Sequence, residues 1–201
     1  MIVKPNDEGS NKGIRANPVA FDFKSAKERC RVLKARYECP VLVEEFLPGK
    51  EVTVGIAGNC PNARVLGMME IAPAEEVAEP FAYSVEVKRE FRKRVRYHMP
   101  PRLDAKIIES LRCLALVAFN LLGCRDVVRL DFRFDAEGQP RFLECNPLPG
   151  LNPESGDIVI LSRSSLSYDN LVQGILLDAM SRVGVSNEGS GPSQLAAVNN
   201  R

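Results

Sequence analysis

Six short segments combine apolar or β-branched residues with nearby Gly, Pro, Asn or Asp, a pattern that predicts β-strands. Two of them surround the polar stretch 135–140 and are expected to form an antiparallel hairpin. Two others are joined by Leu47-Pro48-Gly49-Lys50, which is a second turn signal. The predicted strands cover residues 2–4, 41–43, 51–56, 64–71, 127–134 and 141–146.

In other segments the apolar residues recur every three or four positions, which predicts helices. The most regular pattern begins at Leu103, and Gly123 stands where a C-terminal glycine cap is expected. A further helix is predicted over about residues 22–37, and a last one opens at Ser167. The apolar positions of the most regular helix are Leu103, Ile107, Leu111, Leu114, Ala118 and Leu121.

Two stretches show no clear period. Residues 72–100 are rich in Pro, Glu and basic residues, so most of this stretch is predicted to be a long loop, with a short strand near 83–87. Residues 186–201 have too little apolar surface to fold and are expected to be disordered. The remaining elements predict an α+β fold, in which an antiparallel sheet is flanked by helices.

The composition and charge of the chain argue against several classes of protein. The chain has 201 residues, with 27 Lys and Arg against 26 Asp and Glu, and its formal net charge is +1. This balance argues against a nucleic acid or a membrane surface as the main partner. The longest apolar stretch, 114–124, is far shorter than the roughly 20 residues that cross a bilayer. Because the first residues also lack the features of a secretory signal, we expect a cytoplasmic protein.

The cysteines and the single histidine do not form a recognisable metal-binding motif. None of the six cysteines belongs to a CxxC pair, so they are expected to be reduced thiols that act as small buried residues. His98 adjoins Met99-Pro100-Pro101 and is expected to be a loop residue rather than a catalytic base.

The last hairpin of the predicted sheet has an informative polar pattern. If its loop has an even length and is centred on residues 137–138, Asp131 lies directly opposite Glu144 and Arg129 lies opposite Asn146. All four side chains then share one face of the sheet. The alternate positions, which form an apolar face toward a core, are Leu130, Phe132, Leu143 and Cys145.

Two carboxylates held side by side repel each other unless a divalent cation lies between them. Oxygen ligands from Asp131, Glu144 and the Asn146 amide suit magnesium, which takes few protein ligands and completes its shell with phosphate and water. Arg129 on the same face could hold a phosphate. The alternative is an exposed face on which Arg129 and Arg133 neutralise the two carboxylates, and the pattern leaves both interpretations open.

Two loops contain further candidate chemistry. The glycine-bearing loop 8–13 follows a strand and could cradle phosphate through backbone amides, with Lys4 as a point charge. Its order of residues is not that of a Walker A loop, and an ordinary turn is the alternative. The stretch 88–96 has six Lys and Arg residues. It could bind RNA, remain solvated or close over a polyanionic nucleotide, and the overall charge balance argues against RNA.

Four motifs follow one another along the chain: Val3-Lys4-Pro5 with Glu8-Gly9-Ser10; Val41-Leu42-Val43-Glu44-Glu45-Phe46-Leu47 with Gly49 and Glu51-Val52-Thr53-Val54; Gly123-Cys124-Arg125 with Arg129-Leu130-Asp131-Phe132; and Phe142-Leu143-Glu144-Cys145-Asn146-Pro147-Leu148-Pro149-Gly150. Together they resemble the ATP-grasp part of the D-alanine–D-alanine ligases. The resemblance runs from residue 2 to about residue 182. Four motifs in the right order are far more specific than any one of them.

The resemblance implies an ATP-grasp fold and an ATP-dependent carboxylate–amine ligase. Members of the family convert a carboxylate into an acyl phosphate that an amine then attacks, giving a D-alanyl-D-alanine-like dipeptide for peptidoglycan and the cell wall. Asp131, Glu144 and Asn146 are the implied ligands of Mg2+, or of Mn2+ in its place, which agrees with the pattern argument. Catalytic roles are implied for Arg129 at the transferring phosphoryl group and for Ser10 in a flap over the phosphates.

The resemblance also implies contacts with the nucleotide and the amino-acid substrates. Lys4 and Lys88 are implied near the phosphates of ATP. The other implied contacts are main-chain atoms of Glu44 and Leu47 at the adenine, Glu51 at the ribose hydroxyls, and Gly150 and Ser155 at the second amino-acid substrate.

Two departures from the family pattern concern the substrate. Arg89 stands where the family has a tyrosine after the phosphate-binding lysine, and residues 151–156 differ from the usual threonine and serine-histidine-serine stretch. Because those positions contact the amino acids, a ligase for a different amino or hydroxy acid is one alternative. A non-catalytic nucleotide-binding module is another.

The resemblance further predicts how the chain is organised. Residues 1–47 are expected to be part of a first, incomplete ATP-grasp subdomain, residues 48–185 a second subdomain with the metal and phosphate site, and residues 186–201 a tail. Complete ligases have an N-terminal domain ahead of these motifs, so the chain alone is expected to be weakly active or inactive. The expected partners are ATP and amino acids, not nucleic acid or membrane. A homodimer also stays open, because intact family members are typically dimers.

Overall fold

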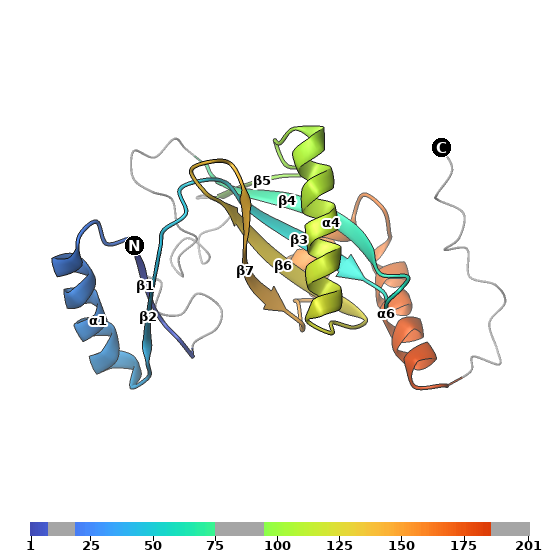
Figure 1. Cartoon of the computed structure of the whole chain (residues 1–201). Helices are drawn as coiled ribbons and strands as arrows, with labels where there is room; N and C mark the ends of the chain where they lie inside the picture. The colour runs from blue at the N-terminus through green and yellow to red at the C-terminus, as the bar shows by residue number, and fades with distance from the viewer. Residues whose placement is uncertain (8–18, 75–94, 186–201) are drawn as a thin grey trace. The chain divides into compact units, whose positions relative to one another are not determined.

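The computed structural model describes residues 1–7, 19–74 and 95–185. Its elements are β1 (Ile2–Pro5), α1 (Phe23–Tyr37), β2 (Val41–Glu44), β3 (Glu51–Ala57), β4 (Arg64–Pro73), β5 (Val95–His98), α4 (Ala105–Leu121), β6 (Val127–Phe134), β7 (Pro140–Asn146), α5 (Asp157–Ser162) and α6 (Tyr168–Arg182). The strands form one sheet with the order β1-β2 and another with the order β5-β4-β3-β6-β7 (Figure 1). The α+β fold and all six predicted strands are confirmed.

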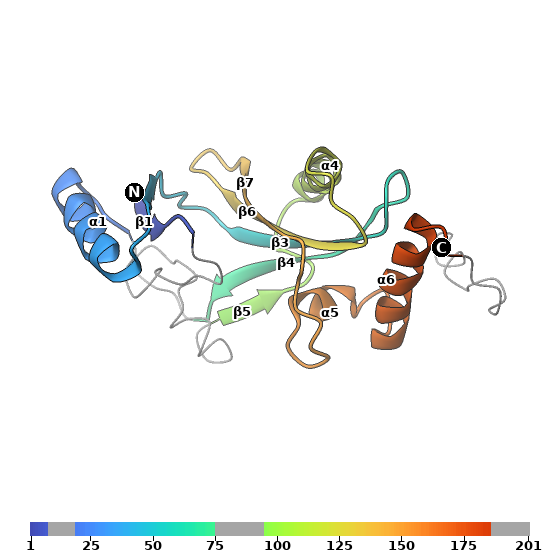
Figure 2. The same cartoon turned by 90° about the horizontal axis from the view of Figure 1, so that it is seen from below.

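The first sheet is a two-stranded antiparallel pair covered by one helix. Ile2 pairs with Glu44, and α1 lies along the two strands (Figures 1 and 2). Apolar side chains of the pair and the helix bury one another, which gives this small element its own core. That core consists of Val3, Ala20 and Ala26, with Cys30, Leu33 and Val41 packed against it.

The helix ends follow the predicted signals. The Asp22 side chain accepts a hydrogen bond from the Ser25 backbone at 2.6 Å, so α1 begins at the next residue after a capping aspartate. Ser167 caps α6 in the same way by accepting from the Asn170 backbone at 3.2 Å. Gly123 follows α4 with φ +65°, the conformation of a C-terminal glycine cap. No helix of the described residues is long and apolar enough to cross a membrane.

Strand β6 is buried along almost its whole length because it lies between β3 and β7. Leu130 and Phe132 are fully buried, as the alternation predicts. The charged residues of the opposite face, Asp131 and Arg133, are buried as well. The alternative of a solvent-exposed charged face is therefore wrong for Asp131 and Arg133, which are 7% and 8% exposed.

The hairpin loop differs from the even-length loop that the sequence interpretation assumed. Asp135 donates its backbone N–H to the Gln139 carbonyl at 3.0 Å, so three residues form the loop, and Gly138 has φ +75°. Such a loop adds a bulged residue and moves the pairing beside it by one position. The loop therefore does not support the predicted pairing, in which Asp131 lies directly opposite Glu144 and Arg129 lies opposite Asn146. Accordingly, the Phe132 ring meets Phe142, with 5.7 Å between ring centroids, and Leu143 is exposed rather than directed toward a core.

The stretch 72–100 contains a strand where a loop was expected. Strand β5 pairs antiparallel with β4, with Glu70 opposite His98 and Pro73 opposite Val95. The sequence pattern missed it because basic residues interrupt the apolar positions, while the pairing itself comes from a strand more than twenty residues earlier. The predicted strand near 83–87 lies outside the described residues.

Helix α5 was not predicted either. Its six residues are too few for a helical period to be visible, although Ile158, Val159 and Leu161 are buried. The helix lies beside α6 (Figure 2). The short segment is helical because it buries an apolar face, which only the tertiary structure provides.

None of the six cysteines, all of which lie in the described residues, forms a disulfide. Cys60 and Cys113 are exposed, so the expectation of a buried residue is wrong for these two. Cys124 and Cys145 lie close together, with 3.6 Å between their sulfur atoms.

Contacts between Cα atoms divide the chain into two compact units. The first comprises 1–54, 68–111 and 130–144, and the second comprises 55–67, 112–129 and the chain from Cys145 onward.

Candidate functional site

Arg133 on β6 contacts three residues of the segment that precedes and begins β3. Its Nε donates a hydrogen bond to the Leu47 carbonyl at 2.6 Å, and its Nη1 donates to Glu51 Oε2 at 3.0 Å. The guanidinium carbon lies 4.8 Å from the centroid of the Phe46 ring, a cation–π distance. Burial lowers the pKa of Arg133, and the nearby Glu51 carboxylate acts in the opposite direction. The group is nonetheless fully charged at neutral pH.

The backbone joins the same two segments. Gly49 donates its N–H to the Phe134 carbonyl and Phe134 donates to the Lys50 carbonyl, both at 2.9 Å. A Cβ added at Gly49 would lie 2.6 Å from the Phe134 oxygen, which real Cβ atoms do not tolerate. Glycine is therefore required for this close approach.

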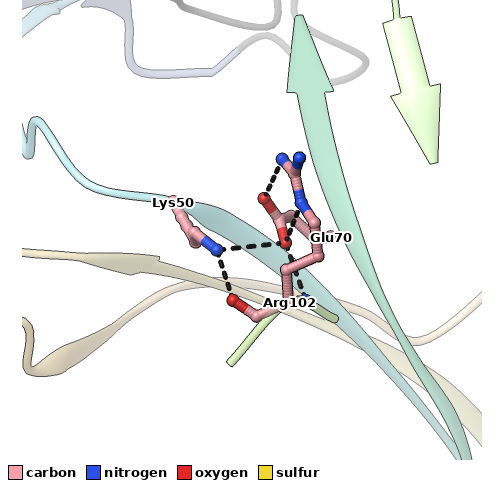
Figure 3. A network of polar contacts seen from close by, with 3 residues as sticks. All are labelled: Lys50, Glu70 and Arg102. Atoms are coloured by element: carbon pink, nitrogen blue, oxygen red, sulfur yellow. Dashed lines mark hydrogen bonds and ion pairs between the residues drawn. The ribbon is translucent and has the colours of Figure 1, made fainter. Parts of the chain in front are cut away.

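Lys50, Glu70 and Arg102 form a polar network beside this segment (Figure 3). The side chain of Glu70 is 2% exposed, and it accepts hydrogen bonds from the Arg102 backbone at 2.9 Å, from Arg102 Nη2 at 2.8 Å and from Lys50 Nζ at 3.4 Å. Lys50 also donates to the Arg102 carbonyl. Burial raises the pKa of Glu70, but the hydrogen bonds and the two cations together hold it below its usual value.

Asp131 projects from β6 two residues before Arg133. It is a buried carboxylate that accepts a hydrogen bond from the Thr53 hydroxyl at 2.9 Å. Glu144 near the end of β7 is exposed.

The predicted donor set fits magnesium in its chemistry. Asp131, Glu144 and Asn146 offer only hard oxygen donors, which suit magnesium rather than zinc. Among the described residues there is no group of three His, Cys, Asp or Glu side chains that could hold a metal ion. Two of the three predicted ligands are carboxylates and the third is an amide, so phosphate and water would complete the octahedral shell of magnesium. Their gathering around a metal stays a prediction.

Arg129, predicted at the transferring phosphoryl group, forms an ion pair with Asp157, the first residue of α5. An arginine that is already paired with a carboxylate can contact a phosphate only by sharing or exchanging that partner. Asp157 therefore affects whether Arg129 can bind a phosphate. The sequence pattern did not indicate this role of Asp157.

Lys4 and Glu44, predicted near the phosphates and the adenine, form an ion pair with 2.6 Å between Nζ and Oε2. Lys4 pairs with Leu42 across the β1–β2 ladder and Ile2 pairs with Glu44, so the two charged side chains are diagonal neighbours on one face. Both are partly exposed, and such pairs contribute little to stability.

The predicted substrate segment 150–156 forms a tight turn. The Asn152 side chain accepts hydrogen bonds from the Glu154 backbone at 2.9 Å and the Ser155 backbone at 3.1 Å. A Cβ added at Gly156 would lie 2.4 Å from the Gly150 carbonyl oxygen, so the turn closes only with glycine at that position. Ser155 is exposed at the surface of this turn.

Ser10 and Lys88 lie outside the described residues. In the first unit the structure brings together Leu47 and Glu51 around Arg133, a residue that sequence reasoning had treated only as a neutralising charge. A signal was available, because Arg133 follows Asp131 by two positions and therefore shares its face of the strand.

Comparison with solved structures shows which fold these elements form. The chain superimposes on the D-alanine–D-alanine ligase of Coxiella burnetii with a TM-score of 0.69 and 19% identity, covering 90% of this chain and 45% of that one. A Bacillus anthracis D-alanine–D-alanine ligase complexed with ATP gives a TM-score of 0.65 and 20% identity, covering 92% and 54%. The fold is therefore the ATP-grasp fold of these ligases.

Comparison of sequences gives the family. The D-alanine–D-alanine ligase of Bordetella pertussis is 34% identical over 183 residues, which cover 91% of this chain and 55% of that protein. An uncharacterized protein of Sinorhizobium fredii, y4sG, is 29% identical over 176 residues, which cover 88% and 51%. The chain thus spans about half the length of the curated relatives it matches. Residues 1–177 match the family model described as D-ala D-ala ligase C-terminus, and the chain belongs to this family.

Proposed function

We propose that this chain provides the nucleotide- and magnesium-binding part of an ATP-dependent carboxylate–amine ligase that forms a D-alanyl-D-alanine-like dipeptide through an acyl phosphate. One observation carries the proposal beyond family membership. On β6, a buried carboxylate, Asp131, stands two residues from Arg133, which holds both Leu47 and Glu51. This proximity of Asp131 to the residue that holds Leu47 and Glu51 supports the proposal.

The nucleoside contacts come from the segment before and at the start of β3. Main-chain atoms of Glu44 and Leu47 bind the adenine, and the Glu51 carboxylate accepts hydrogen bonds from the ribose hydroxyls. Backbone groups suit adenine because its edge offers both a donor and an acceptor. The backbone bonds of Phe134 with Gly49 and Lys50 keep this segment in place, which lowers the entropy lost on binding.

Asp131, Glu144 and Asn146 would hold magnesium, with Mn2+ as a substitute. When bound, the metal neutralises phosphate charge and orients the transferring phosphoryl group. Arg129 stabilises negative charge on that group once it is shared with, or released from, Asp157. Lys4 and Lys88 contact the nucleotide phosphates, and the loop at Ser10 covers them. No protein nucleophile is needed, because positioning and electrostatics carry the transfer.

Gly150 and Ser155 bind the second amino-acid substrate from the turn 150–156. Its carboxylate would accept hydrogen bonds from the Ser155 hydroxyl. The proposed product places the protein in the cytoplasm and in the synthesis of peptidoglycan precursors. Residues 1–47 would then belong to a first subdomain and 48–185 to a second, and a homodimer is compatible with this arrangement.

The proposal is tested by calorimetric titration of Mg·ATP into the unaltered chain and into Asp131→Asn. A ligand of the metal should lower Mg·ATP affinity by about tenfold or more when its charge is removed, with the melting temperature little changed. Glu137→Gln in the hairpin loop is the matched control and should bind like the unaltered chain. Equal affinity in all three proteins, or no binding by the unaltered chain, would reject the proposal.

A nucleotide-binding module without ligase activity is the second candidate. It is favoured by the ion pair between Arg129 and Asp157, because a transferring phosphoryl group could use this arginine only by sharing or displacing Asp157. Phosphate release from ATP that depends on D-alanine, with hydroxylamine trapping of an acyl phosphate, separates the two. Binding without either signal would favour the module, whereas both signals would favour the ligase; a larger signal with another amino or hydroxy acid would identify a different substrate.

A further inference from the structure

We propose that Arg133 is a positioning residue that holds the Glu51 carboxylate in the orientation required by the ribose hydroxyls, so that recognition of the sugar depends on a residue that need not touch it. The inference rests on the proposed function, in which Glu51 binds the ribose. It concerns residues of the first unit only.

The contacts of Arg133 fix both ends of the nucleoside-binding segment. One guanidinium nitrogen donates to the Leu47 carbonyl and another to the Glu51 carboxylate, at 2.6 and 3.0 Å. Leu47 is the last residue assigned to the adenine, and Glu51 is the residue assigned to the ribose. A single rigid, planar group therefore sets the spacing between the two.

The ion pair between Arg133 and Glu51 is largely buried, which strengthens its hold on the Glu51 carboxylate. The side chains of Arg133 and Glu51 are 9% and 14% exposed. A carboxylate so far removed from water requires a partner for its charge, and a charge-assisted hydrogen bond restricts its rotation. A carboxylate can accept about four hydrogen bonds, so the bond to Oε2 is compatible with further donors such as ribose hydroxyls.

The geometry requires arginine rather than any cation. The guanidinium donates in its plane to two acceptors while its face lies over the Phe46 ring. Lysine has a compact ammonium group that cannot match all three partners at once. A lysine substitution should therefore restore the charge without restoring the orientation of Glu51.

Loss of Arg133 should leave β3 folded. Backbone bonds between Gly49, Lys50 and Phe134 hold the start of the strand, and Lys50 is bonded to Glu70 on another strand. Arg133→Met keeps the length of the side chain and removes its charge. Because the buried Glu51 carboxylate loses this charge partner in the variant, circular dichroism is used to establish that the variant is folded before its affinities are compared.

The test compares the affinities of Mg·ATP, Mg·2′-deoxy-ATP and Mg·3′-deoxy-ATP for the unaltered 201-residue chain and its variants. The unaltered chain should prefer ATP to at least one deoxy form by about tenfold, the effect of a hydrogen bond to a charged group. Arg133→Met and Glu51→Gln should each abolish that preference, and the double variant should lose no more than Glu51→Gln alone. Arg133→Lys should recover little of it. The exposed Arg141→Met is the matched control and should keep the preference.

The outcomes separate this inference from the proposed function. If Arg133→Met weakens ATP and both deoxy forms by the same factor, Arg133 acts on folding or on overall charge and the inference is overturned. If the variant keeps the preference for ribose hydroxyls, the inference is overturned while nucleotide binding stands. If the unaltered chain binds no Mg·ATP, both the inference and the proposed function are overturned.

Discussion

Glu70 and Arg102 are joined through both the backbone and the side chain of the arginine. The Arg102 backbone nitrogen lies 2.9 Å from Glu70 Oε2, and Nη2 lies 2.8 Å from Oε1. The carboxylate is buried, whereas the Arg102 side chain is largely exposed. The residue thus ties the chain after β5 to the middle of β4 through a charge that water does not reach (Figure 3).

Glu70→Gln should destabilise the protein by about 2 kcal/mol, because an amide offers donors where Arg102 and Lys50 require acceptors. Urea unfolding followed by circular dichroism measures the change. Glu154→Gln, an exposed substitution of the same kind, should stay within about 0.5 kcal/mol of the unaltered protein. A loss of that small size for Glu70→Gln would show that the network contributes little.

Acid should remove the contribution of Glu70. Its pKa is below the ordinary value of 4.5, so the stabilisation is complete above pH 4.5 and is lost as the pH falls through the lower pKa of the folded protein. The difference in unfolding free energy between the unaltered protein and Glu70→Gln should therefore shrink in acid. Unfolding curves collected at intervals from pH 6 to pH 3 measure it.

Three other carboxylates of the described residues add to the acid sensitivity. Hydrogen bonds lower the pKa of Asp22, Asp126 and Asp135, so their contributions also disappear in acid. These three carboxylates are present both in the unaltered protein and in Glu70→Gln, so their contributions cancel in the difference between the two unfolding free energies. A difference that is constant over the whole range would contradict the assignment to Glu70.

Two glycine substitutions should have opposite effects on stability. Gly49→Ala places a Cβ 2.6 Å from the Phe134 carbonyl oxygen and should cost about 1–3 kcal/mol, with weaker nucleotide binding. Gly174→Ala in α6 meets nothing within 4 Å and should stabilise the helix by about 0.5–1 kcal/mol. Thermal unfolding distinguishes the signs. A neutral Gly49→Ala would mean that the two segments can separate without penalty.

Asp157→Asn should strengthen the binding of Mg·ATP. The substitution removes the carboxylate that is paired with Arg129, so a phosphate no longer competes with a negative side chain for the guanidinium. An increase in affinity of about threefold is expected from an interaction of this partly exposed kind. Asp169→Asn in α6 is the control. Weaker binding by Asp157→Asn would indicate that Asp157 orients Arg129 instead of occupying it.

The sequence predicted those elements whose signals are local. The helix α4, the alternation of β6 and the caps at Ser167 and Gly123 depend on neighbouring residues, and each was located correctly. The apolar face of α4 was only partly correct, because Leu111 is buried as predicted whereas Leu114 and Leu121 are exposed. Strand β5 and helix α5 were missed because both depend on distant partners. The loop 136–138 was assigned the wrong length because one bulged residue at Gly138 leaves no trace in the alternation of side chains.

In the candidate site, too, the sequence predicted features with a local signal and missed those that depend on distant residues. Asp131 could be chosen from its place in the alternation, and the structure shows it buried beside Thr53. The contacts of Arg133 with Leu47 and Glu51 join residues more than eighty positions apart, so no local pattern could reveal them. The pairing of Arg129 with Asp157 was hidden for the same reason.

The charges along β6 also determine how this strand can align with its neighbours. Asp131, Arg133 and Asp135 are all buried, at alternate positions, and their partners are Thr53, Glu51 and Arg141. A slip of one residue would turn all three toward the side where apolar side chains now pack, leaving each charge without its partner. A hairpin in the shifted register should therefore have a much higher free energy than the native one. The same polar residues that resemble a functional site would thus also select the native register of β6 during folding.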